Sequence, residues 1–279
     1  MLFLFLSVLS SSLISVMMRL GEKKRISVMG MFVINYLVCT VLSCLFAGRI
    51  AFYTARPGIG LAMGLGTAAG FLFLVSFMLL QLNIEKNGMA MASTFMKLGV
   101  VVSTLIAVFV FHEKPRMPQV LGIFLAAVSI LLIHTDHTDQ AEARWKWLLP
   151  VLLVCGGVTD SMANVFDKVG NEAVRDYYLF YTFAAALLCA SAAMLARHER
   201  IGREELLEGI LVGIPNYFST RFLLLSLASL PAVIVYPAVS VGTIVMVSLF
   251  GLLLFGEGLS RRKLLAMGLI LLALILLNI

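Results

Sequence analysis

The chain has 279 residues, of which 61% are hydrophobic and 13% charged, and its mean hydropathy is +1.02. Soluble domains carry about 25% charged residues, so this composition excludes a soluble globular protein. One bilayer crossing takes about 20 apolar residues, and ten crossings leave no room for a soluble catalytic domain. The net charge of +6 fits the interfaces and loops of a membrane protein, and we expect no nucleic-acid partner.

Long apolar runs separated by short polar breaks follow one another along the whole chain. The first run starts at Met1 without the basic region or cleavage site of a signal peptide, so we expect it to be a membrane span. The breaks carry charge, Gly or Pro, as in Lys114-Pro115-Arg116. We predict an all-α integral membrane protein with ten transmembrane helices, over residues 2–19, 28–47, 58–82, 88–111, 117–134, 148–168, 177–196, 206–229, 232–255 and 263–279.

The longest break, near the middle of the chain, separates two similar halves. A shift of 144 residues lays Phe111-His112-Glu113 on Phe255-Gly256-Glu257, and a shift of 149 lays span 1 on span 6. Five spans per half would place the two copies in opposite orientations, as in many secondary transporters. We predict a first five-helix repeat over 1–135, a loop over 136–147 and a second repeat over 148–279, arranged as inverted repeats.

On these features the sequence resembles the drug/metabolite transporter superfamily, in particular its EamA-like bacterial ten-helix members. The resemblance rests on the two Phe-x-Glu segments, on Asn35-Tyr36 and on the segment from Gly213 to Phe218. It implies a carrier of small metabolites or drugs that works by alternating access in the bacterial cytoplasmic membrane, with no enzymatic activity and no cofactor. The first helix has Ser where the small dimeric multidrug relatives have an essential Glu, which argues against simple cation antiport through span 1.

Three ionisable side chains, Lys97, Asp160 and Arg221, lie nine or ten residues inside apolar runs. At about 1.5 Å per residue they lie near the midplane of a hydrocarbon core about 30 Å thick, where repeat transporters bind substrate. One interpretation is a structural ion pair that joins Asp160 to Lys97 or Arg221. The other is a substrate site, in which two cations against one acid favour an anion, or a zwitterion whose ammonium meets Asp160.

Polar side chains near these charges complete the predicted substrate site. Aromatic rings could stack on a substrate or surround an ammonium group, and Ser and Thr in the same stripes more often serve helix packing. Besides the three charges, we predict as substrate-binding residues Asn35, Tyr36, Asn164, Asn216, Tyr217 and Tyr236.

Two prolines and three glycine pairs punctuate the spans. Pro215 should kink or break its helix, and Pro237 should act as a hinge, so we assign both to gating. We interpret the pairs Gly60/Gly64, Gly66/Gly70 and Gly209/Gly213 as sites of close helix packing. Glu113 and Glu257 are each expected to stabilise the N-terminal end of the helix that follows them.

Metal, disulfide and nucleotide sites are not supported by the sequence. The metal-like cluster of His134, Asp136, His137 and Asp139 falls in the central loop, and we interpret it as a solvated loop. The four cysteines lie in apolar runs without the spacing of a zinc site. No phosphate-binding GxxxxGK[ST] motif occurs.

The sequence thus predicts a secondary transporter of a small polar metabolite, an amino-acid-like zwitterion or an organic anion, embedded as a monomer or weak homodimer in the lipid bilayer. Protonation of Asp160 could couple transport to protons. One alternative is a carrier of choline-like or other organic cations, with Asp160 as the counter-charge. Another is a membrane enzyme that acts on a lipid phosphate. Orientation stays open, because basic residues cluster in loops that the resemblance places outside.

Overall fold

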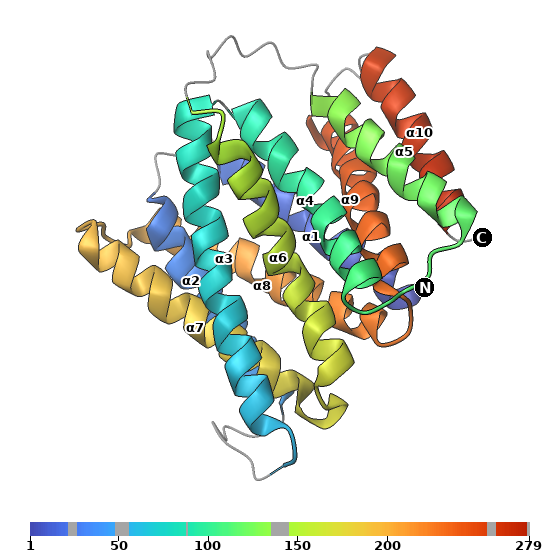
Figure 1. Ribbon diagram of the computed structural model, residues 1–279. Helices are drawn as coiled ribbons and strands as arrows, with labels where there is room; N and C mark the ends of the chain where they lie inside the picture. Colours follow the sequence, from blue (N-terminus) through green and yellow to red (C-terminus); the bar gives the residue numbers. More distant parts are fainter. Residues whose placement is uncertain (22–26, 48–55, 88, 135–144, 256–260, 278–279) are drawn as a thin grey trace. The chain divides into compact units, whose positions relative to one another are not determined.

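The computed structural model describes all residues except 22–26, 48–55, 88, 135–144, 256–260 and 278–279 (Figure 1). The described residues form helices and no strand, which confirms the all-α prediction. The elements are α1 (Leu2–Gly21), α2 (Val28–Phe46), α3 (Ile59–Asn87), α4 (Met89–Phe109), α5 (Met117–His134), α6 (Leu148–Val169), the short 3-10 helix η1 (Glu172–Val174), α7 (Arg175–Ala196), α8 (Arg203–Leu227), α9 (Ala232–Phe255) and α10 (Arg261–Leu277).

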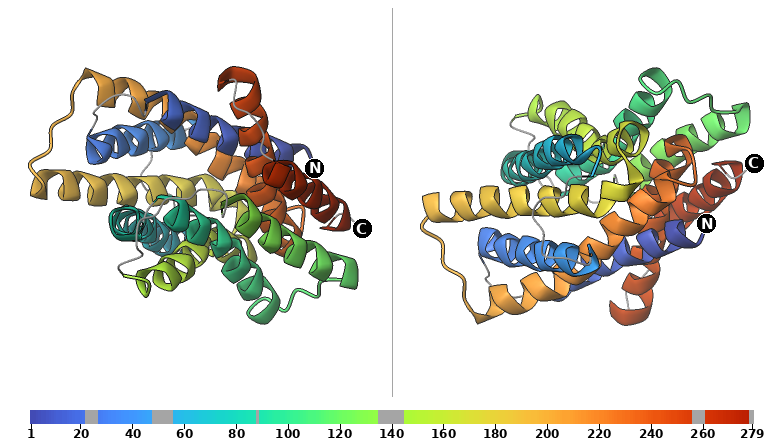
Figure 2. Two further views of the ribbon diagram at one scale, coloured as in Figure 1. Left: turned by 90° about the horizontal axis from the view of Figure 1, so that it is seen from above. Right: turned by 90° about the horizontal axis from the view of Figure 1, so that it is seen from below.

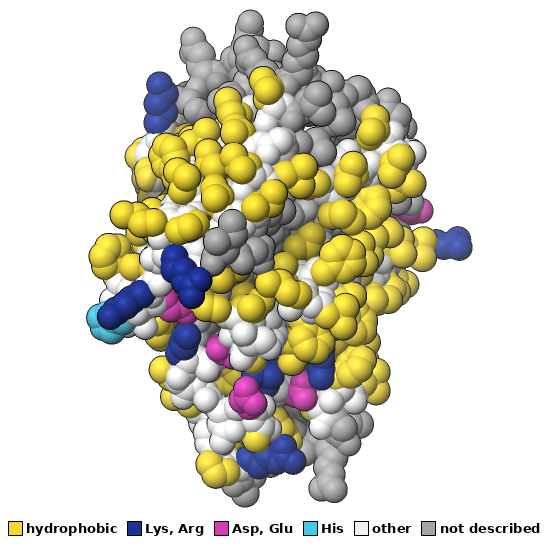
Figure 3. Space-filling view, turned by 90° about the vertical axis from the view of Figure 1, so that its right-hand side faces the viewer, with side chains coloured by type: hydrophobic (Ala, Val, Ile, Leu, Met, Phe, Trp, Pro, Cys, Tyr) yellow, Lys and Arg dark blue, Asp and Glu magenta, His cyan; other side chains and the backbone are white. Residues whose placement is uncertain are grey.

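Several helices have the length and composition of membrane spans. Within the described residues, six segments qualify, from α2, α3, α6, α7 with η1, α8 and α9, and shorter apolar helices occur in α1, α4 and α5. Large apolar side chains such as Phe109, Leu188 and Leu253 are 71–75% exposed. Figure 3 shows apolar side chains spread widely over one face. Such an apolar surface is unfavourable in water and favourable in lipid, so the chain is a multi-pass membrane protein. That it crosses the membrane ten times stays a prediction.

The chain divides into two compact units, and each is assembled from both halves of the sequence. Unit 1 contains residues 75–164 and 226–279, and unit 2 contains residues 2–74 and 165–225. In unit 1, α5 and α10 run side by side (Figure 1), and Gly122 lets the two helices approach closely. In unit 2, α2 and α7 run side by side (Figure 2).

Two of the three glycine pairs serve close packing as predicted, both in unit 2. A Cβ atom at Gly70 would lie 2.3 Å from the Thr182 carbonyl oxygen, so α3 contacts the backbone of α7 there. A Cβ atom at Gly209 would lie 2.4 Å from the Cβ of Ile34 on α2. The prediction is wrong for Gly60 and Gly64, because among the described residues no atom of another segment lies within 4 Å of a Cβ added at either position.

Equivalent contacts recur in the two halves, and their members on α3 and α8 are related by a constant shift of 143 residues. Gly66 and Gly70 of α3 lie against α7, and Gly209 and Gly213 of α8 lie against α2. In unit 1 the Ser76 hydroxyl of α3 bonds to Thr159 of α6, and in unit 2 the hydroxyl of Ser219 on α8 bonds to Ser11 of α1. An internal repeat would produce such matched contacts.

Helix boundaries differ from the prediction where polar side chains find partners. Expected to end near residue 82, α3 continues to Asn87, whose side-chain amide makes two hydrogen bonds of 3.1 Å to the backbone of Trp145. Predicted from residue 206, α8 begins at Arg203, because the Glu205 carboxylate accepts the N–H of Gly202, the residue before the helix.

Candidate functional site

Lys97 and Asp160 lie in the middle of two helices of unit 1. Lys97 is the ninth of 21 residues in α4, and Asp160 is the thirteenth of 22 in α6. Both side chains are exposed, and their charges attract each other. Among the described residues, the Lys97 ammonium and the Asp160 carboxylate do not form a direct ion pair. Charges at mid-helix disfavour contact with lipid, so we expect water or a polar ligand beside these two groups.

The hydroxyl of Tyr236 on α9 holds the backbone of α6 beside Asp160. It donates a 2.8 Å hydrogen bond to the Asp160 carbonyl and accepts a 3.2 Å bond from the Asn164 N–H. In a regular helix these two backbone groups bond to each other, so the hydroxyl bridges one step of the helical ladder. Such an insertion fixes the local helix geometry. Tyr236 is therefore committed to α6, although we had expected it to face substrate.

Close helix contacts fix the position of α6 in unit 1. The Cα of Gly157 lies so near α4 that an added Cβ would come within 2.5 Å of the Gly99 carbonyl oxygen. The Ser103 hydroxyl donates a 3.0 Å bond to the Gly157 carbonyl, and the Ser76 and Thr159 hydroxyls are 2.7 Å apart. Hydroxyl bonds between helices of this kind stabilise packing in bilayers. The segment that carries Asp160 is thus held on two sides.

The Asn164 side chain is fully enclosed without a partner. It is 1% exposed, and neither its Oδ1 nor its Nδ2 atom makes a hydrogen bond. Thr243 of α9 has a buried hydroxyl in the same condition. An unmade bond of this kind costs about 1–3 kcal/mol for each group, so it calls for an explanation.

In unit 2 Arg221 has a direct acidic partner that the sequence did not reveal. Its Nη1 donates to Asp176 Oδ1 at 2.7 Å and to the Tyr217 hydroxyl at 2.6 Å. Its guanidinium also lies 4.8 Å from the centre of the Phe46 ring. Arg221 is six residues from the end of α8, and Asp176 is the second residue of α7. This places the pair about 9 Å from a helix end at 1.5 Å per residue, which is shallower than the midplane depth we expected.

The remaining predicted residues of unit 2 lie on α2 and α8. The Asn216 Nδ2 donates a 3.1 Å bond to Asn35 Oδ1, whereas the buried Asn35 Nδ2 has no partner. Tyr36 and Tyr217 are 5% and 0% exposed. These two tyrosines are part of the packed interior of unit 2.

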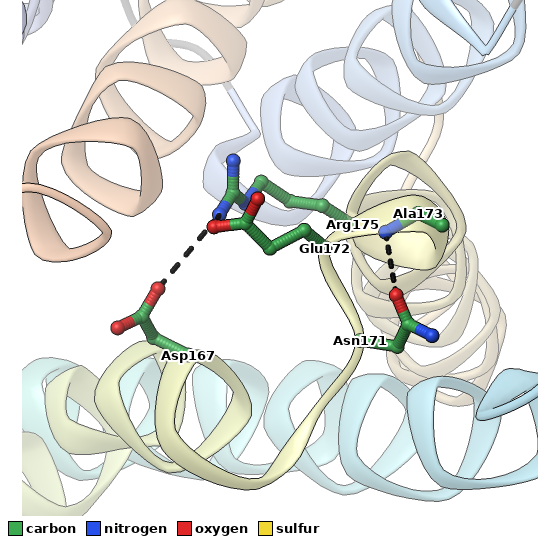
Figure 4. Close-up of polar contacts among 5 residues, drawn as sticks. All are labelled: Asp167, Asn171, Glu172, Ala173 and Arg175. Carbon is green, nitrogen blue, oxygen red and sulfur yellow. Dashed lines mark hydrogen bonds and ion pairs between the residues drawn. The ribbon is translucent and has the colours of Figure 1, made fainter.

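A third charged group lies at the connection between α6 and α7 (Figure 4). Arg175 lies between the carboxylates of Asp167 and Glu172, at 3.8 Å and 3.2 Å. The Asn171 side chain accepts the Ala173 N–H at 2.9 Å and so caps η1. These contacts are confined to the connection and give it a fixed turn.

The two prolines do not interrupt their helices, since α8 continues through Pro215 and α9 through Pro237. The helix break expected at Pro215 is therefore not found, because the turns on both sides of the proline stay hydrogen-bonded. The gating roles of the two prolines stay predictions.

Glu113 caps a helix, but not the one we expected. Its carboxylate accepts the N–H groups of Ala232 at 3.2 Å and Val233 at 3.0 Å, the first two residues of α9. The expected cap was on the following helix, α5, whereas these bonds are to α9; the preceding residue, His112, has a left-handed φ of 54°. Glu257 and residues 135–144, which contain most of the metal-like cluster, lie outside the described residues. The described part of the chain holds no metal-ligand cluster.

The structure thus brings the predicted site residues together in two groups. Unit 1 contains Lys97, Asp160, Asn164 and Tyr236, and unit 2 contains Arg221, Tyr217, Asn35, Asn216 and Tyr36. Only the first group combines exposed opposite charges with an unpartnered amide. It is the best candidate for ligand binding.

Comparisons with known proteins agree with this description. The chain is 23% identical over 274 residues to an uncharacterised protein of Haemophilus influenzae, covering 92% of this chain and 91% of that protein. A crystal structure covering 99% of this chain and 94% of its own shares the fold with a TM-score of 0.74 at 13% identity. Residues 1–135 match the model of the EamA-like transporter family; that residues 148–279 form a second copy stays a prediction. The first 135 residues are therefore similar to the EamA-like transporter family, in agreement with the resemblance of the sequence to the drug/metabolite transporter superfamily.

Proposed function

We propose that the protein is a secondary transporter of a small zwitterionic metabolite in a bacterial cytoplasmic membrane, working by alternating access. The observation that carries the proposal is the pair of exposed opposite charges, Lys97 and Asp160, that interact without direct contact. The match of residues 1–135 to a transporter family supports it. Ionisable groups inside membrane helices typically mark substrate or proton pathways.

The charge balance of the described residues favours a zwitterion over an anion. We expected two cations against one acid, but Arg221 is neutralised by Asp176 at 2.7 Å. One ammonium and one carboxylate then remain in unit 1, at Lys97 and Asp160. The Lys97 ammonium would bind a substrate carboxylate, and the Asp160 carboxylate would bind a substrate ammonium.

The alternatives find less support in the geometry. A carrier of organic cations would need aromatic rings around the ammonium, whereas the hydroxyls of Tyr236 and Tyr217 are bonded to the α6 backbone and to Arg221. A membrane enzyme acting on a phosphate would need Arg221, which is already paired with Asp176.

A ligand screen on the purified protein tests the proposal. The melting temperature is measured with amino acids, sugar phosphates, nucleotides and quaternary amines, for wild type, Lys97→Met and Asp160→Asn. Lys146→Met is the matched control, because Lys146 is exposed beside Trp145 and Trp147 near the start of α6. We expect zwitterions to stabilise wild type and the control but neither site variant. Stabilisation by quaternary amines alone, lost only in Asp160→Asn, would replace the zwitterion carrier with a cation carrier.

Proton coupling through Asp160 is part of the proposal. A carboxylate that meets the substrate ammonium in one state and a proton in another links the two movements. Uptake into proteoliposomes with an imposed pH gradient should be accelerated in wild type and insensitive to the gradient in Asp160→Asn. A variant that still transports and keeps the gradient response excludes Asp160 as the coupling group.

A further inference from the structure

The Asn164 side chain offers one hydrogen-bond donor group and one acceptor that the protein does not use. The residue is 1% exposed, and both atoms of its amide lack a partner in the described structure. Buried side-chain amides normally have partners, since each unmade bond costs about 1–3 kcal/mol. An enclosed amide with both ends unpaired is suited to a ligand that supplies both bonds.

Asn164 lies beside the charge pair of unit 1. It follows Asp160 by four residues in α6, and residues with this spacing lie on the same face of a helix. The Tyr236 hydroxyl binds the Asp160 carbonyl and the Asn164 N–H. One side chain of α9 thus holds both residues in a fixed relation, so a ligand bound at Asp160 would meet the Asn164 amide at a constant offset.

We propose that Asn164 determines substrate specificity by pairing with a neutral hydrogen-bonding group on the substrate side chain. This inference rests on the proposed function, because it assumes that the charged groups of a zwitterion occupy Lys97 and Asp160. The substrate class is then amino acids with a carboxamide side chain, with hydroxyl side chains as a weaker group. A carboxamide fits best because its oxygen accepts from Nδ2 while its NH2 donates to Oδ1.

The chemistry predicts strong discrimination against apolar isosteres. Asparagine and leucine have the same branched shape, but leucine has two methyl groups where asparagine has the amide oxygen and nitrogen. With leucine bound, the Asn164 amide stays unpaired in a closed site. Sites that hydrogen-bond a substrate group reject analogues that lack it far more strongly than apolar sites distinguish similar shapes.

The test measures dissociation constants by calorimetry for the purified full-length protein with L-asparagine and L-leucine. Wild type should bind asparagine at least ten times more tightly than leucine. Asn164→Leu should remove or reverse this preference, whereas Asn164→Gln, which keeps the amide, should retain it. A wild type that lacks this preference overturns the inference even if neither variant folds.

The outcomes separate this inference from the proposed function. Equal binding of the two amino acids, or tighter binding of leucine, overturns the role of Asn164. If Lys97→Met abolishes binding of both in that case, the zwitterion carrier stands. An Asn164→Leu variant that melts at a higher temperature than wild type and still prefers asparagine overturns the inference, because the unpaired amide then only destabilises the fold. If no zwitterion binds wild type, both proposals fail.

Discussion

Each unit of this protein places a cation and an acid on neighbouring helices, but the two pairs differ in contact. In unit 2, Arg221 and Asp176 are 2.7 Å apart, and Arg221 also binds the Tyr217 hydroxyl and lies over the Phe46 ring. In unit 1, Lys97 and Asp160 attract each other without forming an ion pair, and both are exposed.

The difference separates structural charge from available charge. Removing one member of a closed pair leaves the other charge without its partner. Breaking such a pair therefore destabilises the protein. The open pair of unit 1 has no contact to lose, and its groups can bind a ligand instead. Whether a charge inside an apolar run is structural or functional can therefore be judged only when its partner is known.

Breaking the open pair should have the largest effect, and only on function. We expect Lys97→Met and Asp160→Asn each to reduce uptake of the identified substrate about 100-fold, which corresponds to about 2.7 kcal/mol. The melting temperature should change little, because no direct contact is lost. Uptake into proteoliposomes and thermal unfolding measure the two effects, with Lys146→Met as the control. A loss of stability that parallels the loss of uptake would make the open pair structural as well.

Disturbing the helix that carries Asp176 should destabilise unit 2 next most strongly. In Gly70→Ala the new Cβ would lie 2.3 Å from the Thr182 carbonyl oxygen, so α3 and α7 must move apart. Overpacking of this kind costs about 1–3 kcal/mol, and because the new contact is with backbone we expect about 2.5 kcal/mol here. Gly60→Ala, where no atom lies within 4 Å, is the matched control and should melt like wild type. Equal melting temperatures for both variants would show that α3 and α7 are not tightly packed.

Breaking the closed pair should cost stability and leave ligand affinity largely intact. Arg221→Met removes bonds to Asp176 and Tyr217, and because the pair is partly exposed we expect about 2 kcal/mol. A double-mutant cycle with Asp176→Asn should give a coupling energy of about 1 kcal/mol. If Arg221→Met instead abolishes zwitterion binding at unchanged stability, Arg221 contacts the substrate and the distinction between the two pairs fails.

The sequence revealed the single groups but not their partners. Lys97, Asp160 and Asn164 could be selected as candidates because a charge or amide inside an apolar run is visible without a structure. Asp176 was not, since an acid in the first turn of a helix is common and stabilises the helix by itself. Its pairing with Arg221 depends on how α7 and α8 pack, which hydrophobic periodicity does not encode.

The fold was predictable to a similar extent. The apolar runs located the helices, because a bilayer demands long apolar segments, and errors occurred at boundaries where polar side chains cap or clamp a helix. Glycine spacing identified Gly66/Gly70 and Gly209/Gly213 but also the unpacked Gly60/Gly64, since spacing does not say whether another helix lies opposite. The closed contacts of Tyr236 and Glu113 were missed because they join segments far apart in the chain.

Glu113 provides the smallest test, and it sharpens the comparison within unit 1. Its carboxylate accepts two N–H groups at the start of α9, whereas that of Asp160 is exposed without an ion pair in the described structure. Glu113→Gln keeps one acceptor and loses the charge at the helix N-terminus, so it should lower the free energy of unfolding by about 1 kcal/mol. Thermal unfolding and zwitterion affinity are measured together with Asp160→Asn. The two variants should behave in opposite ways, because Glu113→Gln loses stability and keeps affinity while Asp160→Asn keeps stability and loses affinity. If the two variants change stability and affinity in the same way, hydrogen bonding within the protein does not distinguish structural from functional acids in this unit.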